Sequence, residues 1–241
     1  MPHLLDRVIW LNRLPTVYPG LIVANEVLDA MPVHIVRTGA SSVEEAGVTL
    51  KDNAFAWAWR PAGAELLAAV AALGLPEGYL TEIQLVACGF VRALAQAMAR
   101  GVILLVDYGF PAREYYHPER SAGTLMCHHR HRAHADPFFL PGLQDITSHI
   151  DFSAVARAGA EAGLALLGYT GQAQFLINCG ITDILLRTPP ENAAAYAPQA
   201  AAAQQLLSPS EMGELFKVIA FGKDYARPLM GFASGDRRGS L

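Results

Sequence analysis

The stretch that decides the fold is GVILLVDYGF, residues 101–110. Five apolar residues, 102–106, are followed directly by Asp107, Tyr108 and Gly109. A continuous apolar run of this length is typical of a strand that is buried on both faces of a parallel sheet. Ligands of open α/β sheets bind outside the carboxyl ends of the strands, so Asp107 is a candidate site residue. The alternative interpretation is an aspartate that caps a turn with Gly109.

A second apolar run, LIVA at residues 21–24, turns polar at Asn25 and Glu26, with Asp29 just beyond. We expect these polar residues to lie at the carboxyl end of another buried strand. A carboxylate with a neighbouring amide can position and deprotonate a nitrogen or oxygen nucleophile. A strand end that is simply capped by polar residues is the alternative.

The remaining patterns predict an α/β protein that resembles the second half of a doubly wound sheet. Residues 33–60 alternate like an antiparallel hairpin laid against one face of the sheet, with a turn at Asp52 and Asn53. Helices are expected at 64–73, at 82–100 after a Thr81 cap, at 151–163 and at 172–181. A strand is expected at 164–170 and a last one at 216–223. Ser208 and Glu211 form a capping-box pattern before that last strand, and the tail 235–241 is predicted to fray.

Composition excludes several classes of protein. The 241 residues are 52% hydrophobic and carry a net charge of −4, which is enough apolar material for a core and gives no basic field for nucleic acid. No apolar run approaches the roughly 20 residues that span a bilayer. Three scattered cysteines argue against a disulfide framework and fit a reducing cytoplasm.

The stretch CHHRHRAHADPFFLPGLQDITSHIDF, residues 127–152, holds five of the eight histidines. His131 and His134 have a spacing that suits metal ligands, but the neighbouring Arg130 and Arg132 disfavour a divalent cation. Two compatible alternatives are a loop held together by hydrogen bonds and a polar substrate channel. In the first, aspartates pair with basic side chains; the partners would be Asp136, Asp145 and Asp151 on one side and His131, Arg132 and His149 on the other. For Gln172, where a loop enters a helix, the sequence favours ordinary helix-start polarity over a functional role.

Six blocks together resemble the MidA-like methyltransferase family: ANEVLDAMPV, RGVILLVDYGF, YYHPERSAGTLMCHHRHRAHADPF, PGLQDITSHIDFS, GYTGQAQFL and MGELFKVIAFGK. The resemblance covers about residues 15–225, and its motifs are long and distinctive. The family includes a mitochondrial complex I assembly factor that dimethylates a protein arginine. The resemblance therefore implies a class I methyltransferase that uses S-adenosylmethionine on a Rossmann-like sheet. It also implies a protein substrate such as a respiratory complex I subunit, in the cytoplasm of bacteria and in mitochondria of eukaryotic relatives.

The resemblance assigns roles to particular residues. Asn25 and Glu26 would follow the fourth strand beside the methyl donor, and Asp107 would end the fifth. Glu26 is the first candidate for the catalytic carboxylate, with Asp29 and Asp107 as alternates, and His131 or His149 could relay a proton. No metal is expected. The region over the crevice would contain His131, Arg132, His134, Asp136, Gln144, Asp145, His149, Asp151 and Gln172.

The sequence departs from the family at its N-terminus. No glycine-rich strand-to-helix turn precedes Leu21, and no acidic residue follows a second strand to hold a ribose. We therefore expect a partial Rossmann-like domain at 1–187, an Ala/Pro-rich linker at 188–207, and a helix and strand at 208–241 that return to the domain. Strand 21–24 would be an unpaired edge, which favours pairing with another chain, a homo-oligomer included. The alternatives are an inactive fragment, a binding or assembly protein, and a metal-dependent hydrolase built on the histidine-rich stretch.

Overall fold

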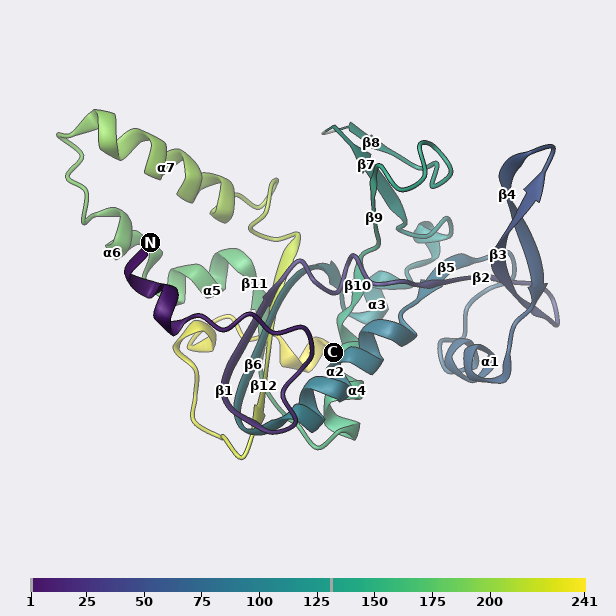
Figure 1. Cartoon of the computed structure of the whole chain (residues 1–241), viewed down its shortest axis with the longest axis horizontal. Helices are drawn as coiled ribbons and strands as arrows, with labels where there is room; N and C mark the ends of the chain where they lie inside the picture. The colour runs from purple at the N-terminus through teal and green to yellow at the C-terminus, as the bar shows by residue number, and fades with distance from the viewer. Residues whose placement is uncertain (1, 131) are drawn as a thin grey trace.

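A central sheet organises the chain, as the computed structural model shows for residues 2–130 and 132–241. Its strands are β1 (Tyr18–Asn25), β6 (Met98–Phe110), β12 (Phe216–Lys223) and β11 (Ala165–Gly171), in that order (Figure 1). β1 runs parallel to β6, whereas β12 is antiparallel to both β6 and β11. A short strand, β10 (Ile150–Asp151), pairs in parallel with the end of β6. The predicted α/β class is confirmed.

Helices cover both faces of this sheet. α2 (Leu85–Ala97) and α4 (Phe152–Glu161) pack on one face, where Val91, Ile103 and Phe221 are fully buried in the main core. α5 (Gln172–Asn178) and the short η3 (Met230–Phe232) cover the other face. Burial on both faces explains why the central strands read as continuous apolar runs.

The predicted strands of the central sheet are found where the apolar runs lie. Residues 21–24 fall within β1 and 102–106 within β6, and β12 covers 216–223 as predicted. Within the described residues β1 lies at the edge of the sheet, as expected. The side chains of Leu21 and Val23 are 57% and 59% exposed, so this edge presents apolar surface.

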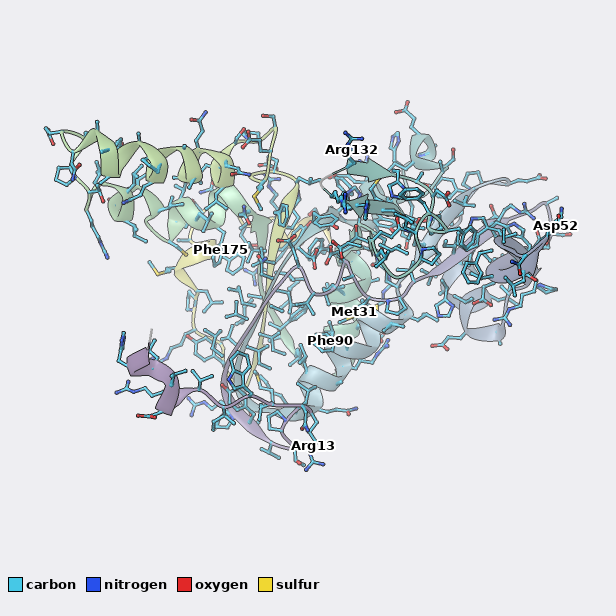
Figure 2. All side chains as sticks on the ribbon, turned by 45° about the horizontal axis from the view of Figure 1, so that its top comes forward. Arg13, Met31, Asp52, Phe90, Arg132 and Phe175 are labelled. Atoms are coloured by element: carbon cyan, nitrogen blue, oxygen red, sulfur yellow. The ribbon has the colours of Figure 1, made fainter. Side chains whose placement is uncertain are left out.

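Residues 33–60 form part of a separate sheet, which corrects the prediction of a hairpin laid on the central one. Its strands are β2 (His34–Thr38), β3 (Val43–Lys51), β4 (Ala54–Pro61) and β5 (Leu80–Ile83), in the order β4-β3-β2-β5. The predicted turn at Asp52 and Asn53 is confirmed, with both residues at positive φ, and Figure 2 shows Asp52 at its outer tip. α1 (Ala64–Ala71) packs on one face through Val36, Leu66 and Val70.

Thr81 does not cap a helix, contrary to the prediction. It lies inside β5, where it pairs with Val36 of β2, and α2 begins only at Leu85 with Gln84 as its N-cap. A local capping signal was overridden here by pairing with a strand more than forty positions earlier in the chain.

The histidine-rich stretch folds into a small sheet of three strands. These are β7 (Met126–His129), β8 (Arg132–His134) and β9 (Asp145–Thr147), in the order β8-β7-β9. α3 (Ala112–Tyr115) and η2 (Pro118–Arg120) connect the central sheet to it. The small sheet stands above the carboxyl end of β6 in Figure 1.

The C-terminal region differs from the prediction in three ways. The expected linker 188–207 is largely helix, α7 (Ala193–Leu207), which follows α6 (Ile181–Leu185) and tolerates Pro198 in its interior. Residues 208–215 form turns instead of a helix, and the backbone N–H groups of Glu211 and Gly213 donate to the carbonyl of Ser208. The tail is anchored by η4 (Arg238–Ser240), because Arg238 donates to the Leu166 carbonyl at 3.0 Å. Among the described residues, no helix is both long and apolar enough to cross a membrane.

Candidate active site

A cavity of about 750 Å³ opens at the carboxyl end of β1 and β6. β12 is antiparallel, so its first residues reach the same edge of the sheet, where Phe216 lies opposite Tyr108. The three-stranded sheet supplies the opposite wall. The lining residues are Glu26, Asp29, Ala30, Tyr108, Thr124, Met126, His128, Gln144, Asp145, Ile146, Thr147, His149, Leu215 and Phe216.

Glu26 enters the cavity directly after β1. Its backbone N–H donates to the Val106 carbonyl at 2.9 Å, which extends the β1–β6 ladder by one bond. Its φ is +50°, a left-handed conformation that is uncommon outside glycine and that concentrates at functional sites. The amide of Asn25 donates to Glu26 Oε1 at 3.0 Å. The end of β1 therefore holds a carboxylate and its amide neighbour at the mouth of the cavity.

Asp107 lies beneath the cavity and does not line it. The side chain is 1% exposed; its Oδ2 accepts the backbone N–H groups of Leu28 at 3.0 Å and Asp29 at 3.2 Å, and its Oδ1 accepts that of Tyr108. Burial and then the charge of Asp29 raise the pKa of Asp107 to about 7. Asp107 thus fixes the backbone of the turn that carries Asp29.

Asp29 and Tyr108 form a directly bonded pair within the cavity wall. The Tyr108 hydroxyl donates to Asp29 Oδ2 at 2.5 Å, and burial followed by Asp29 raises the pKa of Tyr108, so the hydroxyl stays protonated. Asp29 Oδ1 is buried and has no hydrogen-bond partner among the described residues. A buried carboxylate oxygen without a partner calls for a ligand, water or cation.

His149 is a neutral side chain at neutral pH. Its ring packs edge-to-face against Tyr108 and Phe110, each at 5.3 Å between centroids. Burial lowers the pKa of His149 to about 4, helped by the positive charges of Arg120 and Lys217. Its Nδ1 has no partner within the part of the chain that the structure describes.

Gly109 allows β10 to approach β6 closely. A Cβ at this position would lie 2.1 Å from the carbonyl oxygen of Ile150. Only glycine therefore permits the pairing of Ile150 with Gly109, which brings His149 next to Tyr108.

The cavity is anionic. Glu26, Asp29 and Asp145 line it, and its described lining residues contain neither lysine nor arginine. Low-dielectric walls that carry one sign of charge concentrate ligands of the opposite sign. The site therefore suits cationic groups.

The residues that the sequence proposed for the region over the crevice divide into two groups. Gln144, Asp145 and His149 line the cavity together with Glu26 and Asp29. His131 lies outside the described residues, and the remaining ones do not line the cavity. Arg132 is exposed on the outer side of the small sheet (Figure 2), and Asn25 lies beside the cavity without lining it.

Four predicted side chains have structural contacts instead. His134 Nδ1 accepts the backbone N–H of Asp136 at 3.3 Å, and Asp136 Oδ1 accepts that of Phe138 at 2.9 Å. Asp151 N-caps α4 through the N–H groups of Ser153 and Ala154, and Gln172 donates to the Leu206 carbonyl. Among the described residues, Asp136, Asp145 and Asp151 form no ion pair with Arg132 or His149, so the pairing proposed with these two partners is not found, and the pairing with His131 lies outside the described residues. The described residues also contain no group of three or more His, Cys, Asp or Glu side chains that could hold a metal.

Sequence reasoning missed several lining residues. Tyr108 belongs to the motif that named Asp107, and the strand-end rule that selected Asp107 applied to it equally. Thr124 and Met126 lie in a block of the family resemblance, but no role was assigned to the part of that block before the histidines. Phe216 reaches the cavity only because β12 is antiparallel, and strand direction was not readable from its apolar run.

The fold and the cavity define an α/β protein with a ligand site at the carboxyl edge of its sheet. The model of one protein family, described as "Putative S-adenosyl-L-methionine-dependent methyltransferase", matches residues 1–170. The chain belongs to this family, and the resemblance found in its motifs is confirmed. S-adenosylmethionine is accordingly the cofactor of the family.

Solved structures from Burkholderia thailandensis are similar to the whole chain. One, with S-adenosyl-homocysteine bound, is 52% identical with a TM-score of 0.95, and the match covers 100% of this chain and 62% of that one. A native structure gives 52% identity and a TM-score of 0.96 over 100% of this chain and 65% of that one.

More distant relatives are mitochondrial. The protein arginine methyltransferase NDUFAF7 of Mus musculus is 33% identical over 54% of this chain and 29% of its own length. The NDUFAF7 homolog of Drosophila melanogaster is 27% identical over 89% of this chain and 50% of its own length. The chain thus spans half or less of these curated relatives.

Proposed function

We propose that this chain takes part in methyl transfer from S-adenosylmethionine to an arginine of a protein substrate, in the cavity at the end of β1 and β6. The observation that carries the proposal is the anionic lining of that cavity, with Asp29 Oδ1 unpartnered among the described residues. Both reactants are cations, a sulfonium and a guanidinium. The family match and the arginine methyltransferases among the relatives support the same reading.

The residues of the cavity fit the methyl donor. S-adenosylmethionine, when bound, supplies a methyl group activated by a positively charged sulfur. Glu26 would hold it, because this residue lines the cavity directly after β1, and Asn25, the last residue of β1, would support it through the hydrogen bond to Glu26. Met126 and Ile146 add apolar wall beside these polar groups. A carboxylate near a sulfonium offsets its charge, and the apolar wall keeps water from the reacting carbon.

Asp29 is suited to orient the guanidinium. A charge-assisted hydrogen bond from a guanidinium N–H to a carboxylate oxygen can fix the attacking nitrogen. Tyr108 holds Asp29 Oδ2 in place, which leaves Oδ1 available to accept an N–H of the substrate. As the nitrogen–carbon bond forms, the nitrogen must release a proton, and a carboxylate in contact with it can accept that proton. Asp29 and Glu26 are our candidates for this role.

The remaining polar residues position these groups. Asp107 holds the Leu28–Asp29 backbone, so we assign it to positioning the turn instead of the direct catalytic role first considered. His149 stays neutral, and its Nδ1 could accept a second hydrogen bond from the substrate. A respiratory complex I subunit as the substrate, and a bacterial cytoplasmic location, follow from the family resemblance and stay predictions.

Titration calorimetry with S-adenosylmethionine, which carries the sulfonium that Glu26 would face, tests the cofactor part of the proposal. We expect the protein to bind it, Glu26→Gln to weaken binding about tenfold or more through loss of one charged contact, and Glu191→Gln, an exposed carboxylate near α7, to bind as the wild type does. Asp29→Asn should keep binding and lose methyl transfer to an arginine peptide. Absence of binding by the folded wild-type protein would instead favour a binding or assembly protein without a methyl donor.

A further inference from the structure

A second, apolar groove of about 540 Å³ continues from the anionic cavity. The cavity and the groove share a wall, because four residues line both of them: Asp29, Ala30, Ile146 and Thr147. One side of the groove is the face of the β2–β5 sheet that does not carry α1. The other side is the segment that joins β8 to β9.

The sheet side of the groove is built from alternating strand positions. Val48 of β3 pairs with Trp57 of β4, and Leu50 pairs with Phe55, so these side chains point to one face. Val36 of β2 has the opposite orientation and packs with α1. Val48, Phe55 and Trp57 remain more than 40% exposed, although apolar side chains of this size are usually covered.

Phe138 closes the other side of the groove. Its ring lies 4.9 Å from Trp57 and 6.2 Å from Phe55, centroid to centroid. Asp136 Oδ1 accepts the Phe138 N–H, and the Gln144 side chain donates to the Pro137 carbonyl at 2.9 Å. Asp136 and Gln144, two residues of the histidine-rich stretch, thus hold the turn that carries Phe138.

Ser148 is a polar residue of the groove and follows Thr147 of the shared wall. Ser148 lines the groove and is 1% exposed, and its Oγ has no hydrogen-bond partner among the described residues. Such an atom would be satisfied by a backbone N–H or carbonyl of an occupant. Apart from Asp29 at the shared wall, the described lining contains no charged side chain.

We infer that this groove binds an apolar side chain of the protein substrate close in sequence to the modified residue. The inference rests on the proposed function, because it takes the neighbouring cavity as the site of the target residue. A peptide that inserts one residue into the cavity must continue along its wall, and the apolar groove is continuous with that wall. Ser148 Oγ supplies the hydrogen bond that an extended backbone requires there. The groove thereby selects substrates by an apolar neighbour of the target.

Fluorescence anisotropy with two labelled peptides tests this inference on the full chain. Both peptides contain the same central arginine, flanked by leucines in one and by serines in the other. We expect the leucine peptide to bind about tenfold or more tightly, since burial of a leucine side chain is worth a factor of that size. Val48→Ser and Trp57→Ala should remove most of this preference.

Leu67→Ser is the matched control, because Leu67 is 43% exposed on α1 and does not line the groove. It should keep the preference. Equal affinities for the two peptides, no measurable binding of either, or an equal loss in Leu67→Ser would overturn the inference. A change of oligomeric state in Val48→Ser would also overturn it, since a second copy would then occupy the groove. Methyl donor binding is measured separately, so its failure would affect the proposed function without deciding the peptide comparison.

Discussion

Replacing Asp107 by asparagine should change how the stability of the protein depends on pH. Asp107 is buried beneath the candidate active site, and its pKa is raised from 3.8 to about 7 in the folded state. A carboxyl with a raised pKa binds its proton more tightly when folded than when unfolded. Its contribution to the free energy of unfolding is therefore most favourable below pH 4 and is lost as the pH rises towards 7.

The size of this change in stability follows from the pKa shift of Asp107. A difference of about three pKa units corresponds to a loss of about 3 to 4 kcal/mol between pH 4 and pH 7. Asparagine does not titrate, so the variant lacks this loss. Its amide nitrogen cannot accept the Tyr108 N–H that Asp107 Oδ1 accepts, which costs about 1 to 3 kcal/mol at every pH.

Urea unfolding of the wild type and Asp107→Asn at several pH values between 4 and 8 measures the difference. We expect the variant to be less stable than the wild type at pH 4, and to equal or exceed the stability of the wild type by pH 7, because the loss in the wild type is at least as large as the deficit of the variant. Other titrating groups affect both proteins equally and cancel in the difference. A difference that stays constant over this range would refute the assignment of a raised pKa to Asp107.

Three further predictions concern neighbouring residues. Tyr108→Phe should lower the rate of methyl transfer tenfold or more and the free energy of unfolding by about 1.5 to 3 kcal/mol, because Asp29 loses the hydroxyl that holds it; an unchanged rate in a peptide assay would contradict this. His149→Gln should remove a stability gain of about 3 kcal/mol that the wild type acquires between pH 4 and 6.5, since a pKa of about 4 favours the neutral imidazole in the fold; the wild-type minus variant difference in the free energy of unfolding should then rise by this amount between pH 4 and 6.5, and a constant difference would contradict the lowered pKa. Gly109→Ala should lower the thermal midpoint by several degrees, because its Cβ would meet the Ile150 carbonyl, and an unchanged midpoint would show that β10 can shift freely.

The central sheet was predictable from the sequence, because strands that are buried on both faces are apolar along their length. The runs at 102–106 and 218–221 are apolar throughout and lie in the buried strands β6 and β12. The apolar run at 21–24 also became a strand, β1, although Leu21 and Val23 are exposed at the edge of the sheet. β5 was missed because Thr81 joins its sheet through pairing with Val36, which no local pattern records. α7 was mistaken for a linker because Pro198 was given more weight than the alanines around it.

The candidate site was predictable only at its strand ends. Glu26, Asp29 and Asp107 follow apolar runs, so the strand-end rule predicts from the sequence alone that they lie at one edge of the sheet. The bond between Tyr108 and Asp29 joins positions 79 residues apart and depends on side-chain directions that a sequence pattern does not contain. Asp151 and Gln172 were predicted to lie over the crevice. In the structure Asp151 is the N-cap of α4 and Gln172 is the first residue of α5.

We propose that the carboxylates that line the cavity at the end of β1 and β6 promote methyl transfer to an arginine. The most direct test incubates the purified protein with S-adenosylmethionine and the leucine-flanked arginine peptide, and reads the peptide by mass spectrometry. We predict methylation localised to the arginine with the wild type and with Glu191→Gln, and none with Asp29→Asn despite retained binding of S-adenosyl-homocysteine. Methylation by Asp29→Asn at the wild-type rate, or a wild type that binds both ligands and leaves the peptide unmodified, would contradict the claim.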